Sequence, residues 1–253
     1  MKDSIGDRMK DSYENRSRFS LPLRSYTIIR VDGKAFHTYT KGLQRPFDDG
    51  LMEDMDATAA YMCKNIMGAK FAFVQSDEIS ILLTDFEGIG TQAWFDNNVQ
   101  KMCSVSASMA TRAFNECRLA RLAPNCMKWA EFDSRVFQIP SASEVANYFI
   151  WRQQDTTRNS VSSVAQSLYS PKQLHGKGVS DMQEMIFQKG INWNDYAPRY
   201  KRGRMVTKEP YEKQPVPGEK TQSCTRTRWT AVEVPIFTQD KSFLEGLIPT
   251  HDK

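Results

Sequence analysis

The stretch FAFVQSDEISILL, residues 71–83, places three polar residues, Ser76, Asp77 and Glu78, between two apolar runs. Both runs are rich in β-branched and aromatic side chains, which predicts two strands joined by a tight turn. Ser-Asp pairs are common turn formers, so the carboxylates could serve the turn alone. A tight turn could also hold a carboxylate rigidly at the edge of a sheet, as a metal ligand. The rest of the chain has to decide between these two interpretations.

Elements on both sides of the hairpin predict an α/β (α+β) fold. They are a strand over 25–33 that ends at Asp32, a helix over 51–66, the hairpin strands over 71–75 and 79–84, a helix from about 92 to 122 and a strand over 134–140. This β-α-β-β-α-β order is the ferredoxin-like one, in which both helices cover one face and the first and third strands are neighbours. The topology therefore brings Asp32 next to the turn that carries Asp77.

The remainder of the chain predicts a second region. A long helix is expected from 144 to about 169 and a short one over 181–188, followed by a basic extended tail. Pro215, Pro217 and Gly218 predict a mobile loop in that tail. We therefore expect a first domain over 1–140 and a helical, basic C-terminal region over 141–253 that packs on it.

Composition narrows the class of protein. No stretch approaches the 18 consecutive apolar residues of a membrane span, and the start, MKDSIGDRMKDSYENRSR, has no export or organelle signal, which predicts a soluble, cytoplasmic protein. The five cysteines contain no C-x-x-C pair and the three histidines are scattered. This pattern predicts reduced thiols and no Cys/His metal site, so any metal would be held by oxygen ligands.

Basic residues concentrate near the C-terminus. The net charge is only +4, but the segment 199–229 contains nine Lys and Arg against three Glu, interleaved with aromatic residues. Such a stripe is typical of a protein that binds a phosphate backbone. A solvated charged surface remains the alternative.

Two aspartates at one sheet edge would form an oxygen-rich site. Asp32 and Asp77, with the carbonyl of Gly33, suit Mg²⁺. Two such ions can activate an attacking hydroxyl and neutralise a leaving pyrophosphate during nucleotide transfer. Glu78 could orient the site or balance its charge. This interpretation explains the polar break in the hairpin better than a turn does.

Several motifs, in order, carry a resemblance to a known family. RVDGKAFHTYTK, QSDEISILL, FDSRVFQIPS, YFIWRQQD and YKRGR resemble the tRNA(His) guanylyltransferase superfamily of 3′ to 5′ polymerases, over about residues 5–205. The resemblance implies a polymerase-type palm as the catalytic domain and a homotetramer.

One departure from the family pattern concerns specificity. Enzymes restricted to tRNA(His) carry His-x-Asn-Asn after W-R-Q-x-D, whereas WRQQDTTRNS has Thr157 in place of that His and retains Asn159. The chain therefore resembles the bacterial and archaeal "like protein" branch, which reads a template to repair 5′ ends.

The resemblance also implies roles for individual residues. Asp32, the Gly33 carbonyl and Asp77 would be the ligands of two Mg²⁺ ions, with Glu78 as a catalytic neighbour. The residues that would bind the nucleoside triphosphate are Asp32, Gly33, Lys34, Ala35, Phe36, His37, Arg45, Asp48, Ser76, Asp77 and Lys101. Those that would bind RNA are Arg135, Arg152, Asn159, Lys201, Arg202 and Arg204.

Structural alternatives stay open for several of these residues. His37 could be an ordinary histidine at the edge of a strand, and Asp48 could be a helix N-cap. Arg45 could be a charge at the entry of the same helix. The remaining cations could be solvated surface charges.

The expected function is Mg²⁺-dependent addition of nucleotides to the 5′ end of tRNA, above all truncated tRNA. ATP would activate a 5′-monophosphate, and the 3′-hydroxyl of an incoming GTP or other NTP would attack it. The alternatives are a tRNA(His) guanylyltransferase proper, a non-catalytic RNA-binding protein and a nucleotide cyclase. A binder has no use for the repelling pair Asp32 and Asp77, and a cyclase has none for the basic tail.

Overall fold

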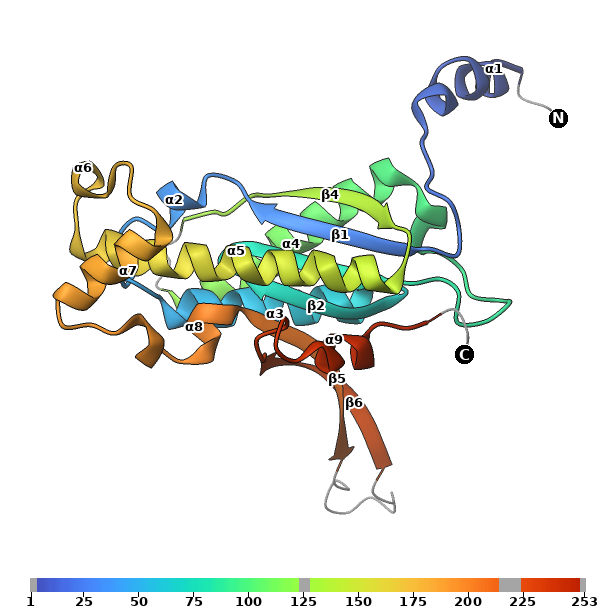
Figure 1. The fold of residues 1–253 in the computed structure, drawn as a ribbon. Helices are drawn as coiled ribbons and strands as arrows, with labels where there is room; N and C mark the ends of the chain where they lie inside the picture. Colours follow the sequence, from blue (N-terminus) through green and yellow to red (C-terminus); the bar gives the residue numbers. More distant parts are fainter. Residues whose placement is uncertain (1–3, 123–127, 214–223, 251–253) are drawn as a thin grey trace, which may run out of the picture.

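The structure, a computed structural model, describes residues 4–122, 128–213 and 224–250 (Figure 1). It is built on one six-stranded antiparallel sheet with the strand order β4-β1-β3-β2-β5-β6. The strands are β1 (Tyr26–Gly33), β2 (Ala69–Gln75), β3 (Glu78–Leu83), β4 (Phe132–Ile139), β5 (Arg204–Lys213) and β6 (Cys224–Glu233). The described α-helices are α1 (Ser4–Ser12), α2 (Phe36–Tyr39), α3 (Asp49–Asn65), α4 (Val99–Arg121), α5 (Ala142–Leu168), α6 (Pro171–Leu174), α7 (Val179–Gln188), α8 (Pro198–Arg202) and α9 (Lys241–Leu247).

The first 140 residues confirm the predicted ferredoxin-like α/β fold. β1, α3, β2, β3, α4 and β4 follow one another in the expected order. β1 pairs with β3 on one side and with β4 on the other, so it lies inside the sheet. Its last residues therefore meet the β2–β3 turn, as the topology predicted.

Alternation along the strands gives the sheet two apolar faces. Ile29 and Val31 of β1 pack in one core with α3 and α4. Ile28, one residue away, points to the opposite face and packs with Phe149 of α5 and Leu244 of α9. Figure 1 shows α5 running across this second face. The C-terminal region thus covers the face that α3 and α4 leave open.

Helix α4 begins later than the sequence pattern predicted. Phe95 and Asp96 have φ values of 51° and 53°, outside the right-handed helical region, so residues 94–97 form a separate short turn. Asn98 then caps α4, because its side chain accepts a hydrogen bond from the Lys101 amide. The predicted start near residue 92 was wrong for this reason.

The described part of the basic tail is extended, as predicted, and its two strands pair with each other as a hairpin. β5 pairs with β2 over three residues, and β6 then pairs with β5 as the edge strand. Pro210 lies where β5 pairs on one side only, which a proline can tolerate. At Gly203, φ is +77° and a Cβ would lie 2.5 Å from the Phe73 ring, so only glycine lets the chain enter the sheet there.

Two further sequence predictions concern the chain as a whole. The loop predicted from Pro215, Pro217 and Gly218 lies outside the described residues. Among the helices that the structure describes, none is both long and apolar enough to cross a membrane.

Candidate active site

Asp32 and Asp77 meet at one end of the sheet. The β1–β3 register places Asp32 opposite Glu78, the first residue after the turn. The Gly33 amide donates a hydrogen bond to the Asp77 carbonyl at 3.1 Å, which ties the end of β1 to the turn. Ser76 has φ +46°, so the two strands are joined by a tight reversal. The structure thus brings together the two carboxylates that the sequence predicted as neighbours.

The two carboxylates have different surroundings. Asp32 lies 3.9 Å from the Arg30 guanidinium and 3.7 Å from that of Arg135, which partly neutralise it. Burial raises the pKa of the Asp77 carboxyl from about 3.8 to about 6, and the charges of Asp32 and Glu78 act in the same direction. Asp77 is therefore an anion that a cation would stabilise strongly.

Gly33 lies between β1 and α2 in a crowded place. A Cβ at this position would lie 2.2 Å from the Phe36 ring. That ring is buried and packs against Tyr39, Phe114 and Phe132, so it has little room to move. Glycine is required here by packing, and its carbonyl lies next to Asp32.

These groups fit Mg²⁺ by their chemistry. In the described part of the chain, no three acidic, His or Cys side chains converge as a complete metal site. Mg²⁺ does not need such a site, since it usually takes one or two carboxylates and fills its octahedron with waters and substrate phosphates. Asp32, Asp77 and the Gly33 carbonyl could supply that partial set of oxygen ligands.

Glu78 turns away from the turn into the protein. It is only 6% exposed, and the Arg152 guanidinium donates to both of its carboxylate oxygens, at 2.8 and 2.6 Å. Ser80 also donates to Glu78 and shares a hydrogen bond with the Tyr148 hydroxyl of α5. Arg152 is 5% exposed, so the structure places this predicted RNA-binding residue inside, as a link between α5 and the β2–β3 turn.

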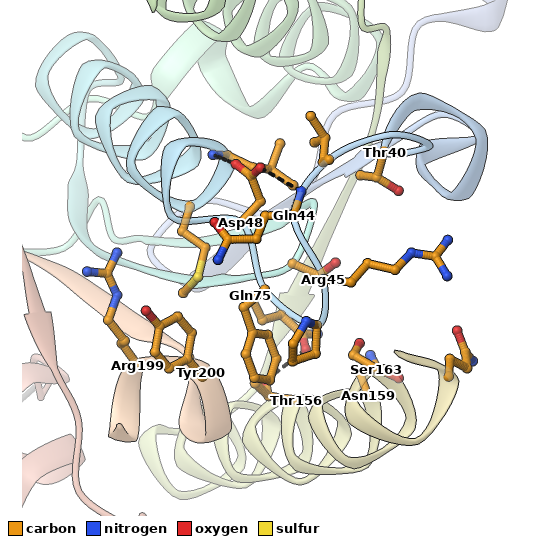
Figure 2. A pocket seen from close by; sticks show the side chains of 18 of the residues that line it. Thr40, Gln44, Arg45, Asp48, Gln75, Thr156, Asn159, Ser163, Arg199 and Tyr200 are labelled. Atoms are coloured by element: carbon orange, nitrogen blue, oxygen red, sulfur yellow. Dashed lines mark hydrogen bonds between the residues drawn. The ribbon is translucent and has the colours of Figure 1, made fainter. Parts of the chain in front are cut away.

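A pocket of about 350 Å³ opens beside the turn, between the loop before α3, α5 and α8 (Figure 2). Six predicted residues line it, together with others that the sequence did not single out. The predicted ones are His37, Arg45, Asp48, Ser76, Asn159 and Arg204. The missed ones include Gln75, Thr156, Ser163, Arg199 and Tyr200. The basic and aromatic interleaving near residue 200 was the one available signal for the last two.

Asp48 is the N-cap of α3, which was one of the two roles considered for it. Its side chain accepts from the Leu51 amide at 2.7 Å and from the Gln44 amide at 3.1 Å, as the dashed lines in Figure 2 show. It therefore holds the loop of Arg45 against the start of α3. On the far side of the pocket, Tyr200 of α8 stacks on Phe47 with ring centroids 4.8 Å apart.

The three residues after Gly33 have separate positions. The Lys34 ammonium forms an exposed ion pair with Glu131 at 2.6 Å. Ala35 has φ +53° where α2 begins, and Phe36 is buried. Of these three side chains, Lys34 and Ala35 are exposed and only that of Phe36 is closed to a ligand.

The predicted RNA-binding cations are spread over several environments. Arg135 is half exposed on β4 beside Asp32. Lys201 is buried and donates to the Asn194 carbonyl, while Arg204 is buried against Asp56. Arg202 is partly buried. The Thr157 hydroxyl donates to the Lys201 carbonyl at 3.2 Å, so the position that distinguishes this chain contacts α8.

Lys101 lies far from the other predicted nucleotide-binding residues. It is in the first turn of α4. This turn lies near the start of β1, because the side chain of Asn97 donates a hydrogen bond to the carbonyl of Pro22. Asp32 is at the other end of β1, whose eight residues span about 26 Å. The structure therefore does not bring Lys101 to the carboxylates within one chain.

Known proteins resemble this chain in sequence and in fold. The family profile described as tRNAHis guanylyltransferase (Thg1) matches residues 6–140, which include β1 to β4 and both aspartates. The chain belongs to this family. Its members are nucleotidyltransferases, so the predictions of family, fold and enzyme class are confirmed.

Solved structures of the family extend the similarity to the C-terminal region. A bacterial tRNA(His) guanylyltransferase (Thg1)-like protein in complex with ATP is 46% identical, with a TM-score of 0.86 over 97% of this chain and 99% of that one. The complex of such a bacterial protein with GTP gives 46% and 0.81 over 98% of this chain and 100% of that one. The tRNA(His) guanylyltransferase of Saccharomyces cerevisiae is 25% identical, with a TM-score of 0.66 over 79% and 91% of the two chains.

Proposed function

We propose that this family member adds nucleotides to the 5′ end of tRNA in the 3′ to 5′ direction, selecting each by pairing with the opposite strand. The observation that carries the proposal is the junction of Asp32 with the Asp77 turn through the Gly33 amide. It supports a catalytic role because it holds a buried carboxylate against its own charge repulsion. A non-catalytic binder would gain nothing from that arrangement.

Asp32, Asp77 and the Gly33 carbonyl would hold Mg²⁺. When bound, the ions supply charge neutralisation at the reacting phosphate and acidify the attacking hydroxyl. Arg30 and Arg135 balance the charge of Asp32 and keep its carboxylate in place. Arg152 holds Glu78 and thereby fixes the strand that leaves the catalytic turn.

The pocket beside the turn would take a nucleoside triphosphate. Solved relatives of this chain carry ATP or GTP, which supports this assignment. The pocket opens at Ser76, the residue before Asp77, so a nucleotide bound there would have its phosphates close to the carboxylates. ATP would activate a 5′-monophosphate, and the 3′-hydroxyl of the next NTP would then displace the activating group.

Repair of truncated tRNA is favoured over guanylylation of tRNA(His) by one residue and by the comparisons. Thr157 occupies the position of the family's His and is engaged with α8. The bacterial like-proteins are 46% identical to this chain, against 25% for the yeast enzyme. We further propose that the enzyme works as a homotetramer in the cytoplasm and that the basic β5–β6 hairpin contacts tRNA.

An assay with several tRNAs tests the proposal. Transcripts of different identity that lack their first nucleotide, together with intact tRNA(His), are incubated with ATP, the four NTPs and Mg²⁺, and products are resolved by length. We expect every truncated tRNA to be extended faster than tRNA(His) gains guanosine. Extension confined to tRNA(His) would instead identify a tRNA(His) guanylyltransferase proper.

A further inference from the structure

Trp129 is unusual among the tryptophans of this chain because it is 70% exposed, more than any of the other four. Burying a side chain of this size is worth about 2 kcal/mol or more, so an exposed one forgoes a large stabilisation. It lies just before β4, at the end of the sheet that carries Asp32.

Hydrogen bonds hold the residues on both sides of Trp129, through the backbone of Ala130 and the side chain of Lys128. Asn115 of α4 clamps the next residue, Ala130: its side chain accepts from the Ala130 amide and donates to the Ala130 carbonyl, both at 2.9 Å. The ammonium of the preceding residue, Lys128, donates to the carbonyls of Tyr39 and Lys41. An exposed indole on a fixed backbone is a preorganised surface, since little conformational entropy remains to be lost on binding.

Alternation along this segment places Trp129 on the catalytic face. Ala130 and Phe132 are buried in the core with α3 and α4. The residues between and after them are exposed on the opposite side, where Arg135 reaches Asp32. This exposed row consists of Trp129, Glu131, Asp133 and Arg135.

Polar contacts connect the row to the site. The backbone carbonyl of Glu131 accepts a hydrogen bond from the Lys34 amide, and its carboxylate accepts one from the Lys34 ammonium. Phe132 lies opposite Gly33 in the β1–β4 register. Trp129 is thus the outermost member of a row that begins at the carboxylates. Two cations accompany this row: Arg135 is part of it, and Lys34 pairs with Glu131.

We infer that Trp129 is a stacking platform for an unpaired base of the RNA substrate. This base would belong to the 3′ strand, just beyond the point where that strand leaves the acceptor stem. The inference rests on the proposed function. At the 5′ end being extended, the duplex stops and the opposite strand continues unpaired. An aromatic face next to a cation is the usual means of binding such a base, and it needs no particular sequence. Lys34 and Arg135, which both lie on the carboxylate side of Trp129, would contact backbone phosphates on that side of the base.

The test is a thermodynamic cycle of protein and RNA truncation. Binding of a tRNA transcript with 2-aminopurine in its unpaired 3′ segment, and of the same transcript without that segment, is measured for wild type, Trp129→Ala and Trp129→Phe. We expect Trp129→Ala to weaken binding of the complete transcript about 5- to 100-fold, to remove the quenching of 2-aminopurine and to leave binding of the shortened transcript unchanged. Trp129→Phe should retain most of the affinity.

Controls separate this inference from the proposed function. Phe187→Ala removes another exposed aromatic ring, 64% exposed on α7, and should leave the affinity for both transcripts unchanged. The readout is binding, so it remains valid even if wild type adds no nucleotide. Equal weakening for both transcripts, no weakening at all, or a change of oligomeric mass in Trp129→Ala would overturn the inference.

Discussion

Replacing Asp77 with Asn should abolish nucleotide addition and, in the metal-free protein, stabilise the fold. The activity is expected to fall by at least a thousandfold, because the variant would lose one of the proposed ligands of the ions that would stabilise charge in the transition state. The fold should gain because the buried Asp77 carboxylate, which lies close to Asp32 and Glu78, loses its charge. Chemical denaturation without metal and single-turnover nucleotide addition with Mg²⁺ measure the two effects.

The direction of the pH dependence follows from the pKa of Asp77. Its folded-state pKa, about 6, lies above its ordinary value of 3.8, so the ionised carboxylate destabilises the native state. That cost, on the order of 3 kcal/mol, is fully present above pH 6 and disappears as the pH falls towards 4. Asp77→Asn should therefore be the more stable protein at pH 8, and the two should converge near pH 4.

Asp133→Asn is the matched control for this variant. Asp133 lies opposite Asp32 in the β1–β4 register, but its side chain is 57% exposed. Neutralising it should change neither the stability nor the rate by more than a few-fold. If Asp77→Asn retained activity within tenfold of wild type, the carboxylate would not be part of the catalytic site.

Arg152→Met should be strongly destabilising, by about 3–5 kcal/mol, because it leaves the Glu78 carboxylate buried without its guanidinium. The double variant Glu78→Met with Arg152→Met should recover most of that loss, since a buried ion pair can be replaced by apolar side chains of similar volume. Unfolding in denaturant measures both of these variants and the single variant Glu78→Met against wild type, and the double-mutant cycle gives the coupling.

Arg158→Met provides the comparison on the same helix. Arg158 also pairs with a carboxylate, that of Asp155, but its side chain is 50% exposed, so its loss should cost less than about 1 kcal/mol. Additive effects of the Glu78 and Arg152 substitutions would contradict the structural role of the pair. Glu78 would then have to be reconsidered as a group that acts directly in catalysis.

The neighbourhood of Asp32 and Asp77 could be predicted because it depends on chain topology. Apolar runs and turn signals were enough to order the strands, and the order alone puts β1 beside β3. That the Glu78 side chain points into the protein could not be predicted in the same way. It depends on α5 covering that face and on a guanidinium 74 residues away in the chain, and neither is encoded in the local pattern.

The placement of Lys101 shows another limit of motif reasoning. A sequence motif can suggest that a residue belongs to a site, but it does not say at which end of a helix or strand that residue lies. α4 has 23 residues, and Lys101 is in its first turn. A helix of that length spans about 34 Å, so a residue at its start lies at the opposite end of the sheet from one that follows its C-terminus.

The β5–β6 hairpin was missed because its sequence carries no apolar run. Around Pro210, β5 consists mostly of charged residues, and beyond its first three residues it pairs only with β6. Such strands depend on their partner rather than on local propensity. The cationic character of the segment was evident, whereas its secondary structure was not.

Base substitution in the opposite strand tests the central claim, that pairing selects the nucleotide added at the Asp32–Asp77 site. One tRNA lacking its 5′ nucleotide is prepared in four versions that differ only in the base opposite the missing position, and the added nucleotide is identified with all four NTPs present. We predict that the enzyme adds the Watson-Crick complement in each case. Addition of guanosine to all four would contradict the account.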